Sequence, residues 1–100
     1  MSVFLVSFDL HSDSTYSTRY TSFMEQVKKT APWWADTTSF VAVETSETID
    51  DFCDRIYYKS SFNQSIDLFL VLDANIKSGR VRGKLRDQDL FKVLPFVKKL

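Results

Sequence analysis

The sequence contains only two glycines, two prolines, one cysteine and one histidine among its 100 residues. So few breakers in a chain that is 44% hydrophobic exclude a disordered segment and predict a compact domain. Cys53 has no second cysteine with which to form a disulfide, so we expect a reducing, cytoplasmic location. The lone His11 excludes the usual zinc arrangements of histidine and cysteine. The longest uncharged apolar run, Leu68 to Leu72, is too short to cross a membrane.

Charge is balanced in total but unevenly distributed along the chain. Thirteen basic and thirteen acidic side chains give a formal net charge of zero, which argues against tight nonspecific nucleic-acid binding by a monomer. From residue 77 onward, eight basic side chains stand against two acidic ones, a net charge of +6, so residues 1–76 carry −6. The eight are Lys77, Arg80, Arg82, Lys84, Arg86, Lys92, Lys98 and Lys99. This asymmetry predicts that the tail faces an anionic partner or the acidic body of a second subunit.

Hydrophobic periodicity predicts six elements in the first 73 residues. Residues 3–10 form an apolar strand, and a stripe from Tyr16 to Ala31 predicts a helix that Pro32 ends. Residues 33–35 and 38–44 indicate two strands around a tight turn. A second helix follows, with Cys53 on its apolar stripe as a small buried hydrophobe, and residues 66–72 form a buried strand.

The resulting order, βαββαβ, predicts an α+β domain of the ferredoxin-like type. We expect a four-stranded antiparallel sheet with two helices on one face, in a single domain over residues 1–100 with a basic C-terminal extension at 74–100. Residues 80–85 alternate as a strand, which would add to an edge of its own sheet or of a second subunit's sheet. A short helix with Leu90, Leu94 and Val97 on one face would follow, interrupted by Pro95.

Asp9 is the strongest functional signal in the chain, because it ends the apolar run Val3 to Phe8. A charge is expensive to bury, so Asp9 must emerge from the sheet or receive a cation. The run is continuous rather than alternating, which is typical of a central strand covered on both faces. Ligands and catalytic groups often collect at strand ends, whereas Asp before His11-Ser12-Asp13-Ser14 also suits a turn cap. Both roles remain open on residue type alone.

The first strand ends in an aromatic-Asp-aliphatic triplet, Phe8-Asp9-Leu10. One helix later, Trp33-Trp34 leads through a turn into the strand Ser39 to Val43. Over about residues 2–73, this pattern resembles the SinR-like branch of the small CRISPR-associated ferredoxin-fold endoribonucleases, a superfamily that VapD-type toxins also resemble.

The resemblance implies a homodimer, with Asp9 as the catalytic residue and as a ligand of Mg or Mn near the two-fold axis. It also implies a tail strand that often crosses to the partner's sheet. The better-known members act in CRISPR adaptation, and several have been assigned metal-dependent nuclease activity. In members that look catalytic, basic residues follow the aspartate, whereas here Arg19 is the first cation.

The tail suggests a second interface. Arg80, Arg82, Lys84 and Arg86 recur at two-residue spacing and predict a row that can track the phosphate backbone of RNA or DNA. The same row also suits a solvated face or an edge protected against aggregation. Trp33-Trp34 fits either base stacking or one ring in the core and one at an interface.

Two function classes follow. One is a metal-dependent ribonuclease or deoxyribonuclease, or a nucleic-acid-binding relative of it. The other is a non-catalytic dimerisation or interaction module in a defence or toxin–antitoxin context. The ferredoxin-like frame carries many functions, so the fold alone does not choose between them.

Overall fold

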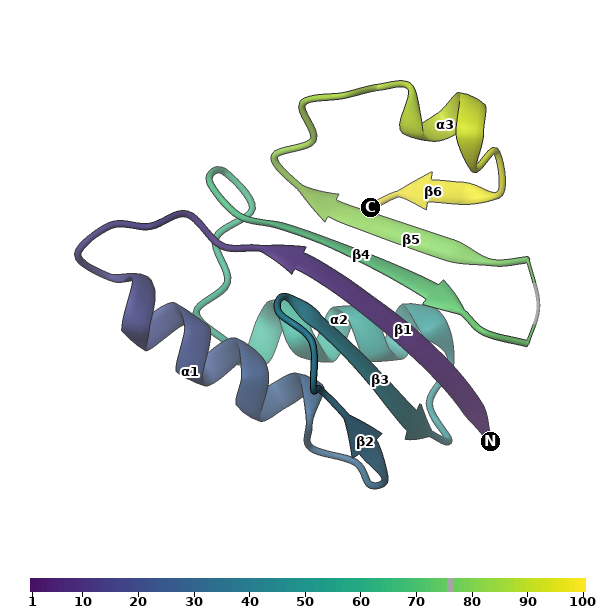
Figure 1. Cartoon of the computed structure of the whole chain (residues 1–100), viewed down its shortest axis with the longest axis horizontal. Helices are drawn as coiled ribbons and strands as arrows, with labels where there is room; N and C mark the ends of the chain where they lie inside the picture. Colours follow the sequence, from purple (N-terminus) through teal and green to yellow (C-terminus); the bar gives the residue numbers. More distant parts are fainter. Residues whose placement is uncertain (76) are drawn as a thin grey trace.

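The computed structural model describes residues 1–75 and 77–100, which form one six-stranded sheet and its helices (Figure 1). In chain order the elements are β1 (Ser2–Asp9), α1 (Tyr16–Val27), β2 (Trp33–Trp34), β3 (Phe40–Thr45), α2 (Ile49–Lys59), β4 (Leu68–Asp73), β5 (Gly79–Gly83), α3 (Leu90–Val93) and β6 (Val97–Lys99). The strands lie in the order β2-β3-β1-β4-β5-β6. Among the described residues, none of the helices combines the length and the apolarity that crossing a bilayer requires.

Helices α1 and α2 lie on the same face of the sheet, and the hydrophobic core fills the space between the two layers (Figure 1). Val6 and Phe8 of β1 are buried there because alternate residues of a strand point to the same face. Phe23 of α1 and Phe52 of α2 are fully buried against the sheet. Both predicted helical stripes therefore supply the core, and Cys53 is buried within it as expected.

The opposite face of the sheet, here called the open face, carries the remaining residues of β1. The continuous apolar run of β1 predicted cover on both faces, and this prediction is wrong. β1 is central, between β3 and β4, but on the open face Leu5 is only half-buried, while Ser7 and Asp9 are exposed. The apolar character of the run therefore indicates a surface that one chain alone leaves partly uncovered.

The α+β class is confirmed, but the predicted four-stranded antiparallel sheet is wrong. The sheet has six strands and is mixed, because β5 pairs antiparallel with β4 while β6 lies parallel to β5. A four-stranded sheet would leave the edge of β4 unpaired. The tail strand β5 satisfies those backbone groups within the same chain, and β6 then becomes the new edge.

The tail differs from its predicted boundaries for local steric reasons. β5 ends at Gly83 rather than at Leu85, because Gly83 has φ +120 and a Cβ there would lie 2.0 Å from the carbonyl oxygen of Asp67. The helix α3 spans only four residues and stops before Pro95. Val97 is buried in β6 instead of extending a helical face.

Candidate functional site

Asp9 is the last residue of β1 and lies on the open face, directly opposite Leu68 of β4. Its side chain is 67% exposed, so the strand has placed this charge in solvent rather than in the core. One carboxylate oxygen, Oδ2, accepts a hydrogen bond from Nη2 of Arg86 at 3.2 Å. The structure thus brings together the predicted metal ligand and one residue of the predicted phosphate-binding row.

A metal such as Mg or Mn requires several oxygen ligands, of which the protein usually supplies one or two carboxylates. Within residues 1–75 and 77–100, no group of three or more His, Cys, Asp or Glu side chains is placed to hold a metal ion. The nearest charged partner of Asp9 is the guanidinium of Arg86, which competes with a cation for the carboxylate. A single chain therefore does not provide a fitting donor set, and a metal at Asp9 would need carboxylates from a second copy.

A hollow of about 440 Å³ lies on the open face next to Asp9. Leu68 and Leu70 of β4 line one side of it, and Leu90 and Val93 of α3 line the other. Its lining is mostly apolar. This composition suits the burial of hydrophobic groups better than the binding of a polyanion.

The predicted phosphate-binding row is divided by the sheet. Arg80 and Arg82 point toward α2 rather than into solvent. Nε of Arg80 donates to Oδ1 of Asp50 at 2.6 Å, and this hydrogen bond lowers the pKa of Asp50. The guanidinium carbon of Arg82 lies 3.8 Å from the centre of the Tyr57 ring. These two arginines attach β5 to α2, which is a structural use of their charge.

Lys84 and Arg86, the other half of the row, are exposed beyond the end of β5. Both side chains are therefore accessible to an anionic partner, and Arg86 lies next to Asp9. Only these two residues of the four thus retain the position that phosphate binding needs.

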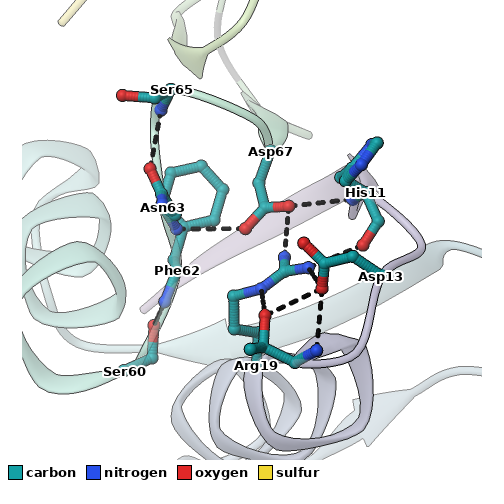
Figure 2. Close-up of polar contacts among 9 residues, drawn as sticks. His11, Asp13, Arg19, Ser60, Phe62, Asn63, Ser65 and Asp67 are labelled. Carbon is teal, nitrogen blue, oxygen red and sulfur yellow. Dashed lines mark hydrogen bonds and ion pairs between the residues drawn. The ribbon is translucent and has the colours of Figure 1, made fainter.

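A buried ionic network lies below the loop that follows Asp9 (Figure 2). Arg19 of α1, with little of its side chain exposed, donates from Nη1 to Oδ1 of the fully buried Asp67 at 2.5 Å. From Nη2 it donates to Oδ1 of Asp13 at 3.0 Å and to the carbonyl oxygen of His11 at 2.6 Å. Asp67 also accepts from the backbone N–H groups of His11 at 2.8 Å and Asn63 at 3.0 Å.

This network joins the β1–α1 loop, the first turns of α1 and the loop before β4. Burial alone would lower the pKa of Arg19, but the hydrogen bonds to Asp67 and Asp13 outweigh it and raise that pKa. The pKa of Asp13 falls to about 2, mainly because the Thr15 hydroxyl donates to it and secondly because Arg19 does. The carboxyl group of Asp13 therefore remains charged at neutral pH, and the network fixes the loop beside Asp9.

Asp67 lies within the predicted strand 66–72, and the apolar pattern of that strand did not distinguish it as a site residue. The signal was present, because a carboxylate inside an apolar run must either reach solvent or receive a cation. The carboxylate of Asp9 reaches solvent, whereas the carboxylate of Asp67 is buried and paired with Arg19. The remote partner, 48 residues away in the chain, could not be identified from local pattern.

Cys53 is not placed to act as a nucleophile. It is buried in the core, and this burial raises the pKa of its thiol to about 12. A thiol with so high a pKa is protonated at neutral pH and is a poor nucleophile.

Comparisons of the chain with protein-family models, with curated proteins and with solved structures give no match.

Proposed function

We propose that this chain is a non-catalytic homodimeric interaction module, and that the open face of its sheet binds a second copy. The context that we propose for it, on the SinR-like resemblance of its sequence, is a defence or toxin–antitoxin system. A ferredoxin-like frame is supported by the βαββαβ order of the first six elements and by the strand order β2-β3-β1-β4. The buried free thiol of Cys53 suits a cytoplasmic location.

The observation that carries the proposal is a continuous apolar row across the open face. In the strand register, Trp34 lies opposite Ala42, Ala42 opposite Leu5, and Leu5 opposite Leu72. Residues directly opposite one another on adjacent strands share a face, so these four side chains form one row. Trp34 at the end of the row is 48% exposed. Exposed tryptophan side chains are among the most frequent anchors of protein interfaces.

A second copy is the partner that the charges favour. The open face also carries charged side chains around the apolar row. Glu44 lies opposite Val3 near the start of β1, Asp9 lies at the end of β1, and Lys99 lies opposite Val81 at the β6 side. A patch with an apolar centre and charges of both signs at its rim can complement itself across a two-fold axis. The zero net charge of the whole chain removes the repulsion that would oppose pairing of two copies.

Light scattering coupled to size exclusion tests this proposal. We expect the parent chain to elute with twice the mass of one chain, and Leu5→Lys to elute as a monomer, because an unpaired ammonium in the apolar centre is costly to desolvate. Trp34→Ser should weaken the dimer about tenfold or more, as loss of an interface anchor does. Circular dichroism confirms that each variant is folded.

Tyr58→Ser is the matched control, because Tyr58 is also an exposed aromatic, at 72%, but lies on α2 and not on the open face. This variant should dimerise like the parent. A parent chain that stays monomeric at tens of micromolar, or a Leu5→Lys variant that dimerises fully, would contradict the proposal.

A second candidate function, a metal-dependent nuclease, is favoured by the position of Asp9. Because Asp9 is exposed on the same open face, pairing of two copies through that face would bring two Asp9 carboxylates to one interface. Bound Mg or Mn would there supply a Lewis acid and an activated water for phosphodiester hydrolysis.

For this candidate, titration calorimetry with Mn²⁺ should show binding by the parent and none by Asp9→Asn, which loses a charged oxygen ligand. Arg86→Gln should bind Mn²⁺ as well as the parent or more tightly, because it removes the competing guanidinium. Equal Mn²⁺ binding by the parent and Asp9→Asn would leave Asp9 with a purely structural role.

A further inference from the structure

A second hollow, of about 350 Å³, lies on the helical side of the sheet, between α1 and the loop that joins β2 to β3. It belongs neither to the open face nor to the surroundings of Asp9. Tyr16, Tyr20 and Lys28 of α1 contribute to its lining, together with the loop from Asp36 to Ser39. This volume is within the range of pockets that hold small molecules.

One wall of the hollow is aromatic. Tyr16 and Tyr20 are one helical turn apart on α1, and their rings stack with centres 5.7 Å apart and planes inclined by 21°. Tyr20 also packs against Phe8 of β1, at 6.4 Å between ring centres, yet remains 38% exposed. A tyrosine ring that is held by aromatic neighbours and is still partly exposed is suited to stacking with a planar ligand.

The opposite wall is a row of hydrogen-bonding side chains in the β2–β3 loop, from Asp36 to Ser39. Within the described part of the chain, these four side chains make no hydrogen bond to protein, so their donors and acceptors are open to a ligand. Ser39 holds the loop in place with φ 60, a left-handed conformation that costs a non-glycine residue about 1 kcal/mol or more. Its carbonyl oxygen accepts from the backbone N–H of Phe8 at 3.1 Å, which fixes the loop to β1.

A single cation completes the lining. Lys28, at the C-terminal end of α1, has its Nζ 4.4 Å from the centre of the Trp33 ring. This contact holds the ammonium in one place at the side of the hollow while leaving it able to donate. A rim with one cation, one carboxylate and three hydroxyls suits a ligand that has both donors and acceptors together with one anionic group.

We propose that this hollow binds a small planar aromatic anion, whose ring stacks on Tyr20, whose polar edge bonds to the row from Asp36 to Ser39 and whose anionic group bonds to Lys28. A nucleoside monophosphate and an aromatic carboxylate share this chemistry. The proposal does not depend on the dimer or on a metal at Asp9, since no residue of either is needed to form the hollow.

The test uses the full chain with three probes, namely adenosine 5′-monophosphate, adenosine and 4-hydroxybenzoate, with binding followed by chemical-shift perturbation and calorimetry. Tyr20→Leu keeps the apolar contact with Phe8 but removes the stacking ring, so it should weaken binding about tenfold or more. Lys28→Met should weaken binding of the monophosphate and leave that of adenosine unchanged. Tyr58→Leu, a substitution of the same type at an exposed tyrosine on α2, should bind like the parent.

Binding of the monophosphate with this pattern assigns the site to nucleotides, and binding of 4-hydroxybenzoate with the same pattern assigns it to aromatic carboxylates. Both results support the proposed chemistry. Absence of binding by all three probes would overturn it. Binding that Tyr20→Leu leaves unchanged would also overturn it, as would chemical-shift changes confined to elements other than α1 and the β2–β3 loop.

Discussion

Replacing Arg19 by Met is expected to lower the free energy of unfolding by about 3–5 kcal/mol, as when one partner of a buried ion pair is removed. The reason is Asp67, whose carboxylate is fully buried and is paired with Arg19. The Met side chain fills much of the volume but leaves that charge unpaired in the interior. A loss of this size is a large part of the stability of a 100-residue domain. Urea unfolding followed by circular dichroism measures it.

Two further variants make this result interpretable. Arg19→Lys keeps the positive charge but loses the fork that reaches both Asp67 and Asp13, so its stability should lie between those of the parent and Arg19→Met. Lys92→Met breaks an ion pair with Asp89 in which both side chains are largely exposed, and should stay within about 0.5 kcal/mol of the parent. An Arg19→Met variant as stable as the parent would show that the network does not hold the three segments together.

The order of the elements was predictable because it rests on local periodicity. Both helix stripes and the cap of α2 are local signals: Thr48, directly before the helix, accepts from the N–H of Asp51 at 3.1 Å, as threonine at this position commonly does. The extent of β5 was less predictable. The strand ends at Gly83, whose φ of +120° is not that of an extended strand. Only glycine fits there, because a Cβ would clash with Asp67, a contact between residues 16 apart that no local pattern shows.

The candidate site was predictable only where it depends on one residue. That Asp9 would emerge from the end of β1 follows from the cost of burying a carboxylate. The cation that lies beside Asp9 could not be predicted, because Arg86 is 77 residues away in the chain. The alternation of residues 80–85 correctly indicated a strand, but not that its basic side would face α2. That orientation depends on Tyr57 and Asp50, which offer a ring face and a carboxylate on the covered side.

The second large effect is expected from the basic row, because two of its four side chains contact α2 and the other two are exposed. Changing Arg80 and Arg82 together to Gln should lower the free energy of unfolding by about 1–3 kcal/mol, because it removes a half-buried ion pair and a guanidinium stacked on Tyr57. Changing Lys84 and Arg86 together to Gln should leave stability within about 0.5 kcal/mol of the parent, since both are exposed. The two double variants remove the same charge and are therefore matched.

For nucleic-acid binding we expect the reverse of the effects on stability: the Lys84 and Arg86 double variant should change it, and the Arg80 and Arg82 double variant should not. We expect at most weak, salt-sensitive binding by the parent, measured by fluorescence anisotropy with short single- and double-stranded oligonucleotides across a salt series. If phosphates contact the tail, the Lys84 and Arg86 double variant should flatten the slope of log affinity against log salt by about 2, since each phosphate contact contributes about 1. The Arg80 and Arg82 double variant should keep the parent slope, because those guanidiniums already bind Asp50 and Tyr57. A flattened slope without loss of stability in that variant would mean that both arginines leave α2 for the phosphate backbone. If the parent shows no binding at low salt, the tail serves the structure of the sheet alone.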